Sequence, residues 1–518
     1  MKIQRTKNTV RNILFGWANK IITTVMPFVT RTIILYFLGA DYLGLGSLFS
    51  SILSFLSLAE LGFSNAMVYS MYKPIAENDG GTICALLNLY KKFYRLIGII
   101  IFVLGMSLFP FLSHLIKGNV PSDINIYLLY IIYLANTLVS YFMFAYRGSL
   151  LTAHQRNDIG SMISSGIVIL QYALQVLALV LFHSYYAYAI CLPLATILTN
   201  IARLIAAKKL YPQYKAKGSV SKELSSSITK KVKALIGAKL NTVVLHASDN
   251  IVMSAFLGLT AIAVYNNYYY IMSAVSGFIT ICYSSMLAGL GNSIVSESIE
   301  KNYKDFEKFS FINAWLVGWC SVCLLCLYQP FMRIWMQNDE TLMFSFAIVI
   351  QLVVYFYLYL IRKIPVTYKD AAGIWWEDRF RPYVCMIINV VSNIILVRIL
   401  GISGIVLSTI LSLAISIPWE NKTIFENVFK RSSGQYYKKM LLYALETAVI
   451  GVITYSLCSF IEGGIFAFIV KMGICVLIPN ALWVLLNRKT AEFCEAVTLF
   501  GNILHISKLR KLGEKLSK

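Results

Sequence analysis

Long apolar runs separated by short polar segments cover almost the whole chain. A helix needs about 20 apolar residues to cross a bilayer, and these runs do not alternate in polarity as the strands of a membrane barrel would. We therefore expect an all-α integral membrane protein with about fourteen transmembrane helices. The expected spans are residues 13–38, 43–71, 93–116, 124–146, 159–182, 184–206, 235–257, 261–289, 309–330, 341–361, 382–399, 402–419, 440–461 and 464–487.

The composition and the placement of charge agree with this prediction. Hydrophobic residues make up 58% of the chain, charged residues make up 14%, and the mean hydropathy is +0.68. Lys and Arg concentrate in every second loop, and the outer loops and span ends carry only Lys117, Arg333 and Arg398. This positive-inside pattern predicts a multi-pass protein of the cell membrane with cytoplasmic N- and C-termini. It also accounts for the net charge of +22 without a nucleic-acid partner.

A lysine- and serine-rich stretch after the sixth span divides the chain. It predicts a basic cytoplasmic linker (208–234) between an N-lobe (1–207) and a C-lobe (235–420) of six spans each. Two further spans (421–487) and a cytoplasmic amphipathic tail (488–518) follow.

A weak internal repeat supports two related halves. The sequence Phe-Leu-Gly ends the first span at Gly39 and the seventh span at Gly258. Aligning the two triplets puts Arg31 opposite Asn250. Paired six-span halves with the substrate at their interface are a known transporter plan.

Charged residues inside the apolar runs are the first candidates for function, because they are costly in a membrane and usually line a wet path. Lys20 and Arg31 lie eleven residues apart, about three helical turns, and so share one face. Arginine suits phosphate because its planar guanidinium can donate two hydrogen bonds at once. Alternatively, Lys20 reaches the inner headgroups and Arg31 pairs with a carboxylate such as Glu60.

The seventh span is the most polar, and Lys239, His246 and Asp249 share one of its faces. His246 beside Asp249 could carry protons, or the group could be a static hydrogen-bonded network. Glu60 could bind a coupling ion, neutralise Arg31 or cap a helix break near Gly62. Cations outnumber anions among these candidates, which favours an anionic substrate.

The sequence offers little chemistry outside this set. Cys320, Cys323 and Cys326 recur every third residue, but no His or carboxylate accompanies them. We interpret them as small buried residues and expect no metal site. The common hydrolase and nucleotide-binding motifs are missing from the sequence, and the outer loops are short. We therefore expect a transporter without catalytic residues or cofactor, with H⁺ or Na⁺ as the candidate coupling ion.

Short signatures in both halves match a known family. They are Arg31 before Phe-Leu-Gly39, Tyr42-Leu-Gly-Leu45, residues 59–66 and 72–76, and, in the second half, residues 248–252, 256–258 and 264–268. These segments resemble the Wzx-like polysaccharide flippases of the multidrug/oligosaccharidyl-lipid/polysaccharide exporter superfamily. The signatures mark this branch and do not identify the sugar.

The resemblance implies two six-helix lobes in a V around a central cationic cavity, plus two C-terminal helices. Such proteins carry undecaprenyl-diphosphate-linked oligosaccharide from the inner to the outer leaflet by alternating access, for capsule, O-antigen or exopolysaccharide. The matched positions imply cavity roles for Arg31 and Asp249.

On physical grounds we add further residues to the candidate site. The full sets are Arg31, Lys20, Lys239 and Asn250 for substrate binding, and Asp249, His246 and Glu60 for ion coupling or gating. The expected partners are the lipid-linked oligosaccharide, membrane lipids and the polysaccharide polymerase machinery.

Other functions remain open at this point. A cation-coupled multidrug exporter of the same superfamily is the main alternative, and it predicts a cavity dominated by carboxylates. A polysaccharide polymerase or ligase would need a large outer loop for catalysis. A lipid scramblase would need no gradient.

Overall fold

The computed structural model of the 518-residue chain describes residues 5–60, 63–118 and 120–503, and within these ranges every regular element is a helix. The helices of the first half are α1 (Arg5–Phe37), α2 (Ala40–Leu56), η1 (Ser57–Glu60), α3 (Phe63–Ala76), α4 (Gly80–Leu108), η2 (Phe109–Leu115), α5 (Ile126–Phe142), η3 (Ala145–Arg147), α6 (Gly148–Ala153), α7 (Asn157–Phe182), α8 (Tyr185–Leu210) and α9 (Lys222–Leu257). Those of the second half are α10 (Leu259–Ser296), α11 (Ile299–Trp335), η4 (Glu340–Leu342), α12 (Phe346–Ile361), α13 (Lys363–Ala372), α14 (Arg381–Leu400), α15 (Ile402–Ile424), the π-helical turn η5 (Phe425–Phe429), α16 (Gly434–Ser459), α17 (Ile465–Asn487) and α18 (Ala491–Ile503).

These helices confirm the expected class of multi-pass membrane protein. In the described part of the chain, 11 helices are long and apolar enough to cross a membrane. A further span bends by 46° between α5 and the pair η3 and α6. Shorter apolar helices at Ala40–Leu56 and Val243–Leu257 occupy two more of the expected spans, so the prediction of about fourteen agrees with the structure.

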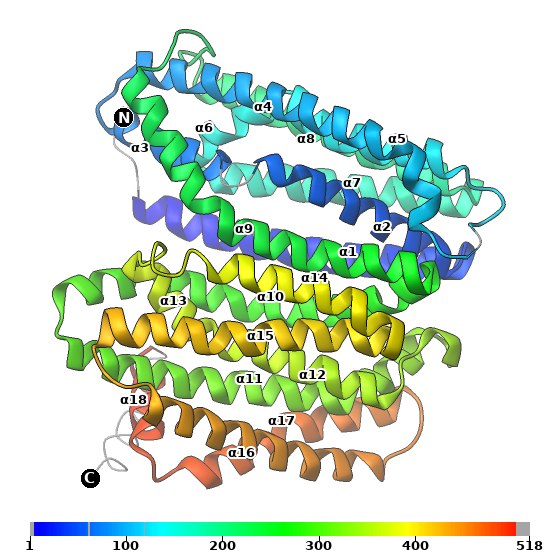
Figure 1. The fold of residues 1–518 in the computed structure, drawn as a ribbon, viewed down its shortest axis with the longest axis vertical. Coiled ribbons are helices and arrows are strands. Elements are labelled where there is room, and N and C mark those ends of the chain that lie inside the picture. Colours follow the sequence, from blue (N-terminus) through cyan, green and yellow to red (C-terminus); the bar gives the residue numbers. More distant parts are fainter. Residues whose placement is uncertain (1–4, 61–62, 119, 504–518) are drawn as a thin grey trace. The chain divides into compact units, whose positions relative to one another are not determined.

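Contacts within the chain divide it into two units, Met1–Ala263 and Val264–Lys518. In the first unit, α1 packs on α7, α7 on α8, α8 on α5 and α5 on α4, while α9 packs on α2 and α3. Figure 1 shows that the helices within this unit run side by side. The seventh expected span therefore makes its contacts with the first unit, although the sequence assigns it to the C-lobe.

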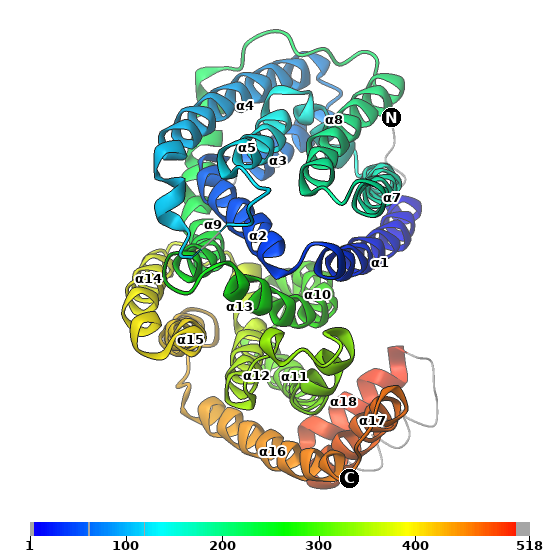
Figure 2. The same ribbon diagram turned by 90° about the vertical axis from the view of Figure 1, so that its right-hand side faces the viewer.

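The second unit is organised around α11. This helix contacts α12, α16, α17 and α18, as Figure 2 shows in a view along the helices. The helices α14 and α15 pack on each other, and α15 also packs on α12. The last two spans are therefore an integral part of this unit.

The predicted repeat has a structural counterpart at two helix ends. Gly39 and Gly258 follow α1 and α9 with φ angles of 107° and 95°, a region that glycine enters without steric cost. The amide of Gly39 donates to the carbonyl of Ile34, and that of Gly258 donates to Met253, both at 3.0 Å. The two Phe-Leu-Gly segments therefore end their helices in the same way.

Two expected segments contain more helix than the sequence suggested. Residues 222–234 of the expected linker already belong to α9, because Ser221 caps this helix by accepting from the amide of Leu224 at 3.3 Å. In the tail, α18 buries Phe493 against α11. Residues 504–518 of the tail lie outside the described ranges.

Candidate functional site

A polar cavity lies inside the first unit, lined by residues of α1, α3, α4, α6, α7 and α8. Its volume is about 720 Å³. It lies beside the turn that joins α6 to α7, which the charge pattern assigns to the cytoplasmic side. The hydroxyl and amide side chains of its lining are Asn19, Ser64, Tyr69, Tyr72, Tyr90, Tyr94, Ser149, Thr152, Asn157, Ser161 and Ser164.

Arg203 supplies a positive charge to this cavity. It is half-buried on α8 and belongs to the cavity lining. Among the described residues none forms an ion pair with it, and Tyr94 supplies its electrostatic contact. Its side chain passes Gly148 on α6, where an added Cβ would lie in ordinary contact with Arg203 Cδ at 3.5 Å. The guanidinium is therefore available to an anionic ligand.

The second arginine of the cavity, Arg156, is already neutralised. Its Nε and one terminal nitrogen donate to the two oxygens of the buried Asp158 at 3.0 and 3.2 Å. These hydrogen bonds raise the pKa of Arg156 above its ordinary value. Nearby, His154 stacks on Tyr211, and burial lowers its pKa, so this imidazole is neutral at neutral pH. The net cationic character of the cavity therefore comes from Arg203.

A chain of hydroxyl groups leads from the cavity to Glu60. The Tyr90 hydroxyl lies 2.7 Å from Ser64 Oγ and 3.1 Å from the Tyr94 hydroxyl. Tyr94 in turn donates to Glu60 Oε1 at 2.5 Å, and Tyr141 donates to Oε2 at 2.8 Å. A carboxylate connected to a wet cavity through hydroxyl groups can exchange protons with it.

Glu60 also lies at a real interruption of its span. The α-helix α2 ends at Leu56, η1 covers Ser57–Glu60, and α3 begins at Phe63. Its carboxylate accepts hydrogen bonds from Tyr94 and Tyr141, and its roles as a cap of this break and as an ion site stay predictions.

The two predicted cations of α1, Arg31 and Lys20, are not among the residues that line the cavity. Arg31 on α1 is half-buried and interacts electrostatically with the phenol groups of Tyr185 and Tyr188 on α8. Lys20 is half-buried on α1, one residue after the cavity residue Asn19. The structure therefore places these two cations on α1 but outside the lining of this cavity.

The α9 candidates contact neighbouring helices. Asn250 donates from Nδ2 to Ser51 Oγ on α2 at 2.8 Å, and Asp249 is buried. The hydrogen bond of Asn250 fits the static-network interpretation of the seventh span. The side chains of Lys239 and His246 lie outside the described residues.

The sequence analysis missed a buried ionic network in the second unit. Asp378 accepts from Lys369 Nζ and from Arg381 Nε, both at 2.7 Å. Glu420 contacts Arg381 at 2.9 Å and Arg362 at 2.7 Å. In the sequence, Arg362, Lys369 and Arg381 lie between two expected spans, where basic residues usually mark a cytoplasmic loop. Asp378 lies in a short connection three residues before Arg381, but Glu420 comes from α15, and nothing in the sequence links it to Arg362 or Arg381.

Comparison with known proteins decides the family. The sequence model of the family described as Polysaccharide biosynthesis protein matches residues 9–288. The chain belongs to this family. The match covers more than half of the chain and includes every helix that lines the cavity around Arg203. No curated protein matches the chain significantly in sequence.

Solved structures share the fold of this family member. The chain is similar to a lipid II flippase MurJ in an inward closed conformation, with 16% identity, a TM-score of 0.65, and coverage of 92% of this chain and 99% of the other. It is also similar to an inward-facing MATE family transporter of the MOP superfamily, with 15% identity, a TM-score of 0.61 and coverage of 79% and 96%.

A third similar structure is that of a mutant of the Vibrio cholerae MATE transporter VcmN, with 13% identity, a TM-score of 0.56 and coverage of 82% and 99%. The family match agrees with the resemblance to polysaccharide flippases, and the solved structures show that the chain shares its fold with a lipid II flippase and with MATE transporters.

Proposed function

We propose that this protein translocates an undecaprenyl-diphosphate-linked oligosaccharide from the inner to the outer leaflet of the bacterial cytoplasmic membrane, by alternating access, for polysaccharide biosynthesis and export. Both termini are then cytoplasmic, as the distribution of Lys and Arg predicts. The flipped product passes to polysaccharide polymerase machinery on the outer side.

The cavity around Arg203 is the observation that carries this proposal. A diphosphate needs a cation with directional donors, and arginine supplies both. Sugar hydroxyls need partners that donate and accept, which the hydroxyl and amide groups of the lining provide. The polyprenyl tail needs neither, because it stays in the lipid. Membership of a family of polysaccharide biosynthesis proteins suggests a saccharide substrate, and the polar groups of the cavity can bind saccharides.

The proposal also assigns Glu60 as the coupling site for H⁺. Its hydrogen-bonded route to the cavity through Tyr94 and Tyr90 gives protons a path between substrate and carboxylate. Substrate binding at Arg203 and protonation of Glu60 then influence each other through Tyr94, which interacts with both residues. Sodium is the alternative coupling ion.

Binding of the lipid-linked oligosaccharide to purified protein in nanodiscs tests the proposal. Arg203→Ala removes charge-assisted hydrogen bonds worth about 1.5–3 kcal/mol, so the Kd should rise about 10- to 100-fold. Arg203→Lys should retain part of the affinity. Lys209→Ala is the matched control, because Lys209 is exposed near the end of the same helix.

A cationic dye serves as the competing ligand. Binding of the dye without binding of the lipid diphosphate would contradict the proposal and favour a cation-coupled multidrug exporter. Arg31→Ala, measured in parallel, separates a role of this arginine in binding from a structural role beside Tyr185 and Tyr188.

A further inference from the structure

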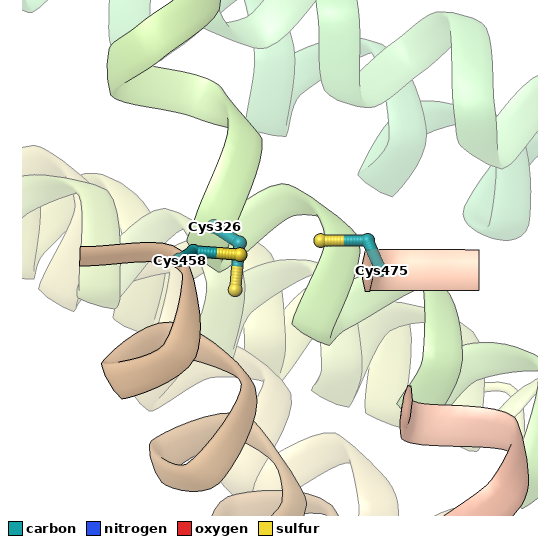
Figure 3. Close-up of side chains that lie close together, drawn as sticks. All are labelled: Cys326, Cys458 and Cys475. Carbon is teal, nitrogen blue, oxygen red and sulfur yellow. The ribbon is translucent and has the colours of Figure 1, made fainter. Parts of the chain in front are cut away.

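Three cysteines from three helices converge inside the second unit. Cys326 lies on α11, Cys458 lies near the end of α16, and Cys475 lies on α17. Their sulfur atoms all lie within 4.8 Å of one another, and all three side chains are buried. Figure 3 shows Cys475 pointing toward Cys326 and Cys458 from the opposite side. All three are free thiols.

Packing alone does not account for what surrounds this cluster. Lys471 precedes Cys475 by one turn of α17 and interacts electrostatically with both Cys458 and Cys475. A nearby cation favours the thiolate form of cysteine, which is the form that binds metal ions. The three thiols therefore converge from separate helices, with one lysine close to two of them.

A cavity gives the cluster access to ions. Cys326 and Cys458 belong to the lining of a cavity of about 1010 Å³, which also includes Lys471, Arg333, Glu340 and Glu462. These charged groups make one part of the cavity polar. The thiols lie where the cavity meets the apolar core of the second unit. The cavity therefore brings ions next to Cys326 and Cys458, while Cys475 lies behind them in the core.

The donor set selects a class of ion. Thiolates without histidine or carboxylate prefer soft metals. Structural zinc sites in proteins take four ligands, whereas this group offers three. Three sulfurs suit trigonal Cu(I), for which metal–sulfur bonds of about 2.3 Å would place the sulfurs about 4 Å apart. The observed separations need a shift of less than about 1 Å to reach that geometry.

We propose that Cys326, Cys458 and Cys475 form a site for a soft, thiophilic metal ion of the Cu(I) class. Each thiol that becomes a ligand releases its proton through the adjoining cavity. The bound ion links α16 and α17 to α11, so that the two C-terminal spans are fixed to the rest of the second unit. Lys471 offsets part of the negative charge of the thiolates.

The test measures Cu(I) retention by the full chain, reduced and kept free of oxygen, in nanodiscs. Protein is loaded with Cu(I), exposed to a competing Cu(I) chelator and analysed for metal content. The variants are Cys326→Ser, Cys458→Ser and Cys475→Ser. The matched control is Cys385→Ser, because Cys385 is equally buried in the same unit but lies outside the cluster. Size-exclusion profiles and metal-free Tm values show that each variant is folded.

Wild type and Cys385→Ser should each retain about one ion per chain, and the metal should raise their Tm by mass action. Each cluster variant should lose the ion and the rise in Tm. X-ray absorption should show a first shell made of sulfur only. A variant that folds poorly is replaced by Cys→Ala at the same position and is compared by metal content alone.

Several results would overturn the proposal. They are no retention by wild type, equal retention by the cluster variants, or retention of zinc in place of copper. A reduced protein that binds no copper but readily forms a Cys326–Cys458 disulfide would identify a redox pair instead.

Discussion

Asp378 is a buried carboxylate that pairs with two cations, Lys369 and Arg381, so the buried network depends on its charge. Burial raises the pKa of this carboxyl, but the hydrogen bonds and charges of Arg381 and Lys369 lower it more, so its pKa lies below the ordinary value. A carboxyl group whose pKa is lowered by folding stabilises the folded state at pH values above its pKa in the unfolded chain, about 3.9. This contribution is lost as the pH falls through the pKa of the folded state. At neutral pH the contribution is complete.

Asp378→Asn should therefore lower the free energy of unfolding at neutral pH by about 3–5 kcal/mol, because it removes the nearest counter-charge of the buried Lys369 and leaves Arg381 paired with Glu420 alone. Thermal unfolding in detergent checks this as a fall in Tm. Glu377→Gln is the control, since Glu377 is exposed and adjacent in sequence, and it should change stability by less than about 0.5 kcal/mol. Equal effects of the two substitutions would contradict the role assigned to Asp378.

Among single residues of the candidate site, some could be predicted from the sequence and others could not. Glu60 is a carboxylate inside an apolar run, so it stood out, and the structure connects it to the cavity. Arg203 lies three residues from the end of its expected span, where arginines commonly reach the headgroups. It therefore did not stand out as a candidate for substrate binding. Tyr90 and Tyr94 looked like ordinary apolar aromatics, because nothing local shows that their hydroxyls point to a carboxylate.

At the scale of elements, close helix contacts depend on single glycines. Gly404 on α15 faces α14 so closely that a Cβ at this position would lie 2.2 Å from the carbonyl oxygen of Leu396. Small residues commonly allow such approaches between membrane helices. The mutual packing of α14 and α15 therefore requires a residue without a side chain at position 404.

Gly404→Ala should force α14 and α15 apart and cost about 1–3 kcal/mol, seen as a lower Tm in detergent. Gly473→Ala on α17 is the matched control, since nothing described lies within 4 Å of its added Cβ, and this substitution should leave Tm unchanged or slightly raised. A drop in Tm for Gly473→Ala of the same size would mean that any added methyl group is harmful, and would contradict the argument from close approach.

The apolar runs predicted where the helices lie but not how the helices are interrupted. Hydropathy gives the length and the polarity of a span, so the number and type of elements followed from it. The bend after Phe142 and the turn at Ser57–Glu60 do not change the hydropathy of their spans, so hydropathy cannot reveal them. Both interruptions depend on tertiary contacts such as that between Glu60 and Tyr141. The same reason hid the cysteine cluster, since Cys326 meets Cys458 and Cys475 only after three helices pack.

At the scale of the whole molecule, the proposed coupling predicts a specific defect. Glu60→Gln keeps the size of the side chain but removes its charge and its ability to take up a proton, and one of its two tyrosine partners must then accept from the amide nitrogen instead of donating. Flux of the lipid-linked oligosaccharide in proteoliposomes should then lose its response to a pH gradient, while the Kd for the lipid changes by less than about 3-fold. Tyr141→Phe, which removes one partner and keeps the carboxylate, should weaken the response without abolishing it.

Two controls make this measurement decisive. A sodium gradient without a pH gradient separates the two candidate ions. Wild-type flux that ignores both gradients would contradict ion coupling at Glu60, and Glu60→Gln flux that still follows the pH gradient would move the coupling site elsewhere.

The hydrogen bond between Glu60 and Tyr141 joins two interrupted spans, since η1 breaks one and the 46° bend after α5 breaks the other. Non-helical backbone at membrane depth is tolerated only beside protein or water, and the cavity lies at this junction. The voltage across a membrane falls mainly over the part that water does not reach, so a wet indentation steepens the electric field over the remaining thickness. A full crossing of one charge is worth about 2.3 kcal/mol per 100 mV, and a proton that reaches Glu60 through a water-filled cavity would cross part of that field. Under the proposed coupling, each proton taken up by Glu60 also displaces charge in this field, so the resting voltage of the cell should change how readily the site loads.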